Sequence, residues 1–169
     1  MRDASPEARL RRAGQADAAA ILAVLRAAFS EHEGRLAPPS GALSESVATI
    51  ERRLETETCL VAERDGRLVA AVFYKDHGDH LYFGRLSVRP EWRGRGLARR
   101  MIAAIEAAAR AAGIDRVALN VRIALPGNIA FFVWLGYREV ARETHAGFSA
   151  PTSLRLEKRL GRGVGLSRP

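Results

Sequence analysis

A short run of glycine and arginine residues has the chemistry to bind phosphate groups. Gly94 and Gly96 follow an apolar run and come directly before a segment with helical periodicity. The first backbone N–H groups of a helix lack intrahelical partners and carry partial positive charge, and glycine lets a ligand approach them closely. Arg93 and Arg95 add formal charge and forked donors. Residues 93–98 therefore predict a site for phosphate oxygens at a helix N-terminus.

Two better-known phosphate-binding motifs do not fit this run. A dinucleotide fingerprint needs a third glycine and an acidic residue about twenty positions further on, after a second strand. A nucleotide P-loop needs a Lys followed by Ser or Thr, and Gly96 is followed by Leu97 and Ala98. For the Gly-x-Gly pattern taken alone, a glycine-containing turn without a ligand stays an alternative.

The elements that must position this run alternate along the chain. Periodicity and turn residues predict a strand, two helices, three strands, a helix, a strand, a helix and two strands. This order predicts a mixed α/β sheet, antiparallel at first and parallel where the central helix crosses over. The expected bounds are a strand at 8–13, a helix N-capped by Asp17, a loop at 34–41, a helix starting at Ser44 with Val47, Ile50 and Leu54 on its apolar stripe, strands at 58–63, 67–74 and 80–88, a helix at 96–112, a strand at 116–121, a helix at 128–135, and strands at 137–145 and 152–160.

The length of 169 residues predicts one compact domain. We expect this domain to cover 8–160, with flexible ends at 1–7 and 161–169 because these ends offer little apolar surface. The single Cys59 excludes an internal disulfide framework and favours a buried position in a strand. The N-terminus has no apolar signal region and no apolar run is long enough to span a bilayer, so we expect a cytoplasmic protein without a membrane partner.

The net charge of +8 is carried almost wholly by arginine, since Lys75 and Lys158 are the only lysines. Such an excess favours anionic partners, or it reflects arginine in place of lysine on solvated faces. The arginines are spread along the chain, and no basic strand carries interleaved aromatic residues. We therefore do not expect a nucleic acid as the partner.

Two motifs in the chain together resemble the GNAT family of N-acetyltransferases. Residues 93–98 match that family's acetyl-CoA signature, Arg/Gln-x-x-Gly-x-Gly/Ala, and the lead-in at 86–92 is also similar. Residues 128–137 are similar to its second run, which has Asn-x-Ala at its start, aromatic residues within it and Gly-Phe/Tyr at its end, with a strand at 117–120 between the two. The resemblance implies a mixed, mostly antiparallel sheet of six or seven strands, flanked by about four helices, with a splayed parallel pair at the cofactor site.

The resemblance also implies acetyl-CoA as co-substrate, with no metal. The backbone of the turn is expected to hold the pyrophosphate, and the preceding strand and a later helix the pantetheine arm. These residues are Arg93, Gly94, Arg95, Gly96, Leu97 and Ala98 in the turn, Leu86, Ser87 and Val88 in the strand, and Asn128, Phe131 and Phe132 in the helix. The N–H of Val88 is expected to polarise the thioester carbonyl. An N-cap role for Asn128, and core packing for the two phenylalanines, remain alternatives.

Two positions depart from the family's commonest pattern for direct attack of an amine on the thioester. Phe132 stands where many members carry a general-acid tyrosine, and the strand before the turn offers Tyr82 and Arg85 but no glutamate. Tyr82, His145 and Glu31 are therefore candidate bases or substrate contacts. We expect loop 31–43 and turn 144–148 to line the acceptor groove. The implied acceptor is an amine of a small molecule or of a peptide or protein.

Other roles and functions stay open at this point. Tyr137 is a candidate general acid by residue type, or an aromatic of the core at the start of a strand. Phe132 and the missing strand glutamate favour a non-catalytic acyl-CoA sensor as one alternative function. A transferase that uses a longer acyl-CoA is another. We expect a monomer or a homodimer.

Overall fold

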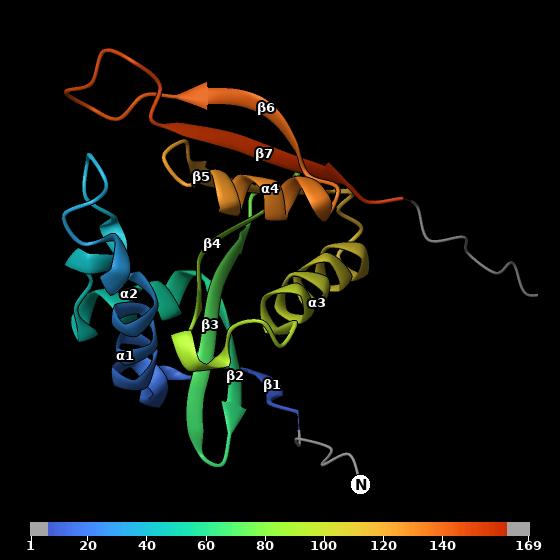
Figure 1. Cartoon of the computed structure of the whole chain (residues 1–169). Helices are drawn as coiled ribbons and strands as arrows, with labels where there is room; N and C mark the ends of the chain where they lie inside the picture. Colours follow the sequence, from blue (N-terminus) through green and yellow to red (C-terminus); the bar gives the residue numbers. More distant parts are fainter. Residues whose placement is uncertain (1–6, 162–169) are drawn as a thin grey trace, which may run out of the picture. The chain divides into compact units, whose positions relative to one another are not determined.

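The computed structural model describes residues 7–161 of the chain, which falls into two compact units (Figure 1). Within the described residues, the first unit holds 7–75 together with Gly84–Ile102, and the second holds Asp76–Phe83 and 103–161. The expected flexible ends lie almost wholly outside the described residues. The single domain at 8–160 stays a prediction.

Seven strands and four α-helices follow one another in the described part of the chain, in the predicted order. Short 3-10 turns lie at Gln15–Asp17, Ser30–His32, Gly41–Ser44 and Pro90–Trp92. The helices and strands are β1 (Arg9–Arg12), α1 (Ala18–Phe29), α2 (Val47–Thr56), β2 (Thr58–Arg64), β3 (Arg67–Asp76), β4 (Leu81–Val88), α3 (Leu97–Ala111), β5 (Arg116–Arg122), α4 (Pro126–Trp134), β6 (Arg138–Glu143) and β7 (Ser153–Arg159).

The strands form one sheet in the order β1-β2-β3-β4-β5-β7-β6. The pairs β1–β2, β2–β3, β5–β7 and β6–β7 are antiparallel, whereas β4 and β5 are parallel. This confirms the predicted mixed and mostly antiparallel sheet. Leu81 pairs with Val117 and Tyr82 with Ala118, at the start of both parallel strands. A splay of the two strands towards their other ends stays a prediction.

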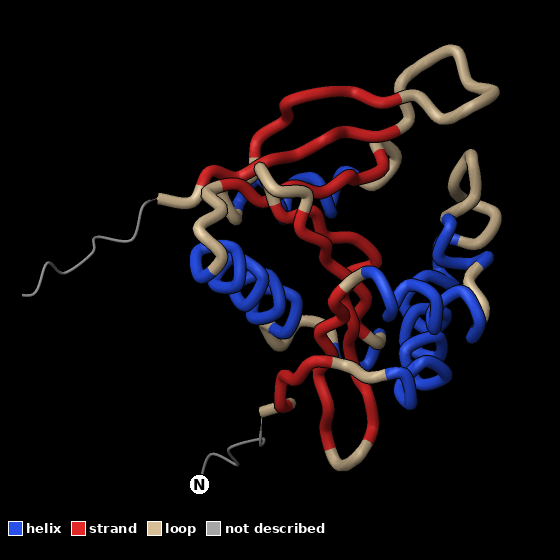
Figure 2. The backbone as a smooth tube through the Cα atoms, turned by 180° about the vertical axis from the view of Figure 1, so that it is seen from behind, coloured by secondary structure: helices blue, strands red, loops and turns tan. Residues whose placement is uncertain are grey.

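The core of the first unit packs α1 and α2 on the sheet strands β2 and β3. The two helices lie side by side in both views (Figures 1 and 2). Ile21 and Leu25 of α1 and Ile50 of α2 are fully buried against Phe73 of β3 and Cys59 of β2. The predicted burial of Cys59 is therefore confirmed, and this burial raises the pKa of its thiol to about 12.

The core of the second unit contains a group of three aromatic rings. Tyr137 contacts Phe83 and Phe132 edge-on, with ring centroids 6.1 Å apart in each pair. The buried Tyr137 hydroxyl donates to Glu106 Oε1 at 3.1 Å, and Lys158 Nζ donates to the same oxygen at 2.9 Å. Burial raises the pKa of the Tyr137 phenol, and the neighbouring Glu106 carboxylate adds to the effect. These contacts favour the core interpretation of Tyr137.

Asp17 occupies the predicted N-cap position of α1, but its side chain does not cap the helix. Its carboxylate makes no capping hydrogen bond to α1, and it instead accepts two from the Arg11 guanidinium, at 2.8 and 2.9 Å, and one from the Gly14 N–H at 2.8 Å. The hydrogen bond from Arg11 holds the pKa of the Asp17 carboxyl below its ordinary value. Asp17 therefore closes the 3-10 turn before α1 and ties it to β1.

The predicted starts of α2 and α4 are displaced. Ser44 ends a 3-10 turn, and Ser46 caps α2 by accepting from the Thr49 N–H while the Thr49 hydroxyl accepts from the Ser46 N–H. Val47 is the first residue of α2 and is exposed, so it does not belong to the buried stripe. The helix α4 begins at Pro126, a residue suited to the first helical position. Asn128 is thus its third residue, and the N-cap alternative for it is wrong.

Candidate functional site

The backbone of β4 departs from regular strand geometry at Arg85, before the predicted phosphate turn. Arg85 has a φ of 56°, in the left-handed region that costs a non-glycine residue about 1–2 kcal/mol. The buried Ser87 donates its hydroxyl to the Arg85 carbonyl at 2.8 Å, which ties the altered backbone together. Regular strand geometry is therefore interrupted in the segment where the pantetheine arm is predicted to pair.

Beyond β4 the chain forms a turn whose backbone donors are free. The 3-10 turn at Pro90–Trp92 is followed by Gly94 and Gly96, with φ of 72° and 73°. The first helical hydrogen bond runs from the Arg100 N–H to the Gly96 carbonyl at 3.0 Å. Within 7–161, the N–H groups of residues 94–98 donate to no protein acceptor. Consecutive free donors at a helix N-terminus form a concave site for an anion.

The space beside these glycines is open. A Cβ placed on Gly94 or on Gly96 meets no atom within 4 Å. Packing therefore does not require glycine at either position, whereas the left-handed backbone does. The arrangement that the sequence predicts, with donors that a ligand can reach directly, is thus present at residues 94–98.

The side chain of Arg93 is used differently from the sequence expectation. Its guanidinium donates to the Ala28 carbonyl at 3.0 Å and to the Val88 carbonyl at 3.3 Å, and pairs with Glu31 at 2.8 Å. Arg93 thus fastens the turn to the end of α1. The Arg95 guanidinium lies 4.8 Å from the ring centre of Trp92. Arg93 is thus committed to protein acceptors, whereas the exposed Arg95 guanidinium keeps N–H donors in addition to the backbone N–H groups of the turn.

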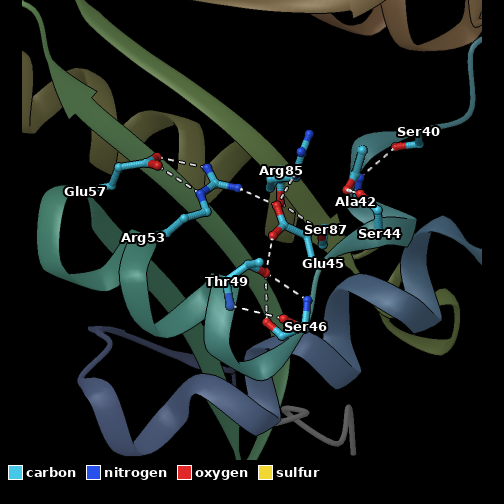
Figure 3. Close-up of polar contacts among 11 residues, drawn as sticks. Ser40, Ala42, Ser44, Glu45, Ser46, Thr49, Arg53, Glu57, Arg85 and Ser87 are labelled. Atoms are coloured by element: carbon cyan, nitrogen blue, oxygen red, sulfur yellow. Dashed lines mark hydrogen bonds and ion pairs between the residues drawn. The ribbon is translucent and has the colours of Figure 1, made fainter.

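A row of charged side chains leads from α2 to β4 in the same unit (Figure 3). Arg53 pairs with Glu57 through two hydrogen bonds of 2.9 Å and donates to Glu45 at 3.2 Å. The same Glu45 oxygen accepts from Arg85 Nε at 3.2 Å. Burial alone would raise the pKa of the Glu45 carboxyl, but hydrogen bonds from Thr49 and Arg85 hold it below its ordinary value. Glu45 is therefore an ionised, largely buried link between the two arginines.

The candidate bases fall into different units. Glu31 lies beside the turn through its pair with Arg93. Tyr82 belongs to the second unit, where the Arg155 guanidinium lies 5.1 Å from its ring centre. His145 also belongs to that unit: its N–H donates to Thr152 Oγ1 at 3.1 Å and its Nδ1 lies close to the same oxygen. Their catalytic roles stay predictions.

The three predicted contacts in α4 also belong to the second unit. Phe132 is buried in contact with Phe83 and Tyr137, which favours the core-packing interpretation. Phe131 is half-buried, with its ring centre 5.3 Å from that of Phe132, and Asn128 is exposed. Asn128 is therefore accessible to a ligand.

No helix in the described range is long and apolar enough to cross a membrane. The His, Cys, Asp and Glu side chains at 7–161 do not gather in any group of three or more suited to a metal ion.

Comparison with known proteins assigns the chain to a family. The Acetyltransferase (GNAT) family matches residues 19–137. An acetyltransferase of Pectobacterium atrosepticum is 35% identical over 95 residues, which are 54% of this chain and 66% of that protein, just under two thirds of its length. The ribosomal-protein-S18-alanine N-acetyltransferase from Escherichia coli superposes with a TM-score of 0.73 at 16% identity, covering 95% of this chain and 98% of that one. The PaiA N-acetyltransferase from Thermoplasma acidophilum, in complex with coenzyme A, superposes with a TM-score of 0.74 at 17% identity, covering 89% and 98%. These two structures share the fold, and the family match spans well over half of the sequence, so the chain belongs to the GNAT acetyltransferase family.

Proposed function

We propose that this chain is an N-acetyltransferase that moves the acetyl group of acetyl-CoA to the amine of a small molecule, a peptide or a protein. The observation that carries the proposal is the row of free backbone N–H groups at residues 94–98, between left-handed glycines and the first turn of α3. Family membership supports it, and one structural relative is in complex with coenzyme A.

In the proposed complex the N–H groups of residues 94–98 bind the pyrophosphate oxygens. Arg93 acts indirectly, because its side chain holds this turn against the Ala28 carbonyl. The backbone of Leu86, Ser87 and Val88 pairs with the pantetheine arm. Asn128, Phe131 and Phe132 of α4 are the further proposed contacts of that arm.

The proposed reaction is direct transfer. The lone pair of a neutral amine attacks the thioester carbon, the Val88 N–H donates to the oxygen that becomes negative, and the C–S bond then breaks. The thiolate leaves with the bonding electrons, and the proton lost from nitrogen passes to a base or to water. Tyr82, His145 and Glu31 remain the candidate bases or substrate contacts. The ion pair with Arg93 favours a structural role for Glu31.

The test is to incubate the protein with acetyl-CoA and a panel of amines, and to follow the release of free thiol together with the mass of the product. The proposal predicts turnover with at least one amine. Tight binding of coenzyme A without turnover across a broad panel would favour the sensor. Faster turnover with butyryl-CoA or hexanoyl-CoA than with acetyl-CoA would favour a longer acyl donor. Absence of coenzyme A binding would contradict all three.

A further inference from the structure

Arg85 has one edge of its guanidinium bound and the other available. Its Nε donates to Glu45 Oε1 at 3.2 Å. Among the described residues, no acceptor binds its Nη1 or Nη2 groups, and a third of the side chain, 33%, is exposed to solvent. The two Nη groups form the end of the fork, whose donors match both oxygens of a carboxylate.

The guanidinium is oriented by its hydrogen bond to a largely buried carboxylate. Glu45, whose side chain is only 9% exposed, is itself held by Arg53 and by the Thr49 hydroxyl at 2.6 Å (Figure 3). The left-handed backbone at Arg85 is a local cost that the surrounding contacts must offset. A donor pair ordered before binding loses less conformational entropy when a ligand arrives.

The 3-10 turn at Gly41–Ser44 leaves room for this guanidinium. A Cβ on Gly41 would lie 2.7 Å from Arg85 Nη2, too close for the present position of the side chain. The φ of Gly41 is not positive, so its backbone conformation does not require glycine. The absence of a side chain at Gly41 therefore leaves the space that the Arg85 guanidinium occupies.

We propose that Arg85 recognises the acceptor, and that it binds a carboxylate carried by the amine substrate through Nη1 and Nη2. This inference rests on the proposed function, since Ser87, two residues further along the same strand, is a proposed cofactor contact. The row Glu57, Arg53, Glu45 and Arg85 has no net formal charge, and a carboxylate at its open end continues the alternation of signs. The substrate class is thus a small amine with a carboxylate, as in an amino acid.

The test compares matched acceptors, each amino acid against its amide, with ethanolamine and O-phosphoethanolamine as further probes. The wild-type chain should prefer the carboxylate form. In Arg85→Gln, kcat/KM for the carboxylate form should fall roughly ten- to a hundredfold, as expected for a lost charged hydrogen bond, while that for the amide and the affinity for coenzyme A stay unchanged.

Gly41→Ala provides a second variant that keeps Arg85 and Glu45. Because the atom displaced is the end of a flexible side chain, we expect the fold to persist while the guanidinium moves and the preference for carboxylates falls. Gly14→Ala is the matched control: Gly14 has a φ of −114°, and its Cβ would meet nothing within 4 Å. It should leave the preference unchanged.

Several results would overturn the inference. These are equal turnover of acid and amide by the wild type, an equal loss for both forms in Arg85→Gln, an unchanged preference in Gly41→Ala, and a preference for the phosphorylated amine over the carboxylates. Coenzyme A binding and acetylation of some amine, with any of these results, would leave the proposed function standing. Failure of coenzyme A binding, or of every acceptor, would contradict both.

Discussion

Replacing Gly96 by Asp places a carboxylate where the cofactor phosphates are proposed to bind. With φ at 73°, any side chain costs about 1–2 kcal/mol in backbone strain. Aspartate and asparagine tolerate the left-handed region better than other non-glycine residues, which keeps this cost at the low end of the range. Repulsion between two unit charges 5 Å apart is about 3 kcal/mol at an effective dielectric constant of 20. Allowing for salt screening, coenzyme A affinity should fall roughly ten- to a hundredfold, with little loss of folding stability.

Isothermal titration with coenzyme A, beside thermal unfolding, measures both quantities. Gly96→Asn keeps nearly the same shape without the charge, so it should lose less affinity than Gly96→Asp. Gly113 supplies the matched control, because it has a φ of 74° and equally open space just beyond the end of α3. Gly113→Asn should lose similar stability yet bind coenzyme A like the wild type. Undiminished affinity in Gly96→Asp would refute the placement of the phosphates.

Three further predictions concern the residues that support the site and the core. Tyr137→Phe removes the hydroxyl that donates to Glu106 but keeps the ring, so unfolding stability should fall by about 1 kcal/mol while turnover persists; loss of turnover alone would point to a general acid. The pKa of the Cys59 thiol is about 12 in the folded chain, whereas the pKa of a cysteine thiol in an unfolded chain is about 8.5. Stability should therefore fall as the pH rises from about 9 to 12, and denaturant titrations of Cys59→Ala should show a weaker fall. Arg93→Gln removes the link to Ala28, so coenzyme A affinity should drop several-fold. Amide exchange at residue 93 and at Arg100, whose N–H groups donate to the Pro90 and Gly96 carbonyls, should speed up; unchanged exchange would contradict the fastening role.

The sequence alone predicted the order of elements, because periodicity and turn residues are local signals. The central helix, expected at 96–112, lies at Leu97–Ala111. The helix starts were less predictable, since the capping role of a polar residue depends on what else competes for its side chain. Asp17 has the residue type of an N-cap, but the Arg11 guanidinium takes its carboxylate.

The phosphate turn was visible in the sequence because its glycines lie in the short segment that joins β4 to α3. The contacts around it were not. Arg85 and Glu45 lie 40 positions apart, and Arg93 and Ala28 lie 65 apart. Periodicity carries no information about such pairs, and the open edge of Arg85 follows only from the course of the folded chain.

Backbone amide spectra of the labelled protein during a titration with coenzyme A test the central claim most directly. The account predicts that the N–H resonances of residues 94–98 shift strongly and move downfield, as free donors acquire phosphate oxygens. Those near Gly113 should stay in place. Binding that leaves residues 94–98 unchanged while other amides shift would contradict it.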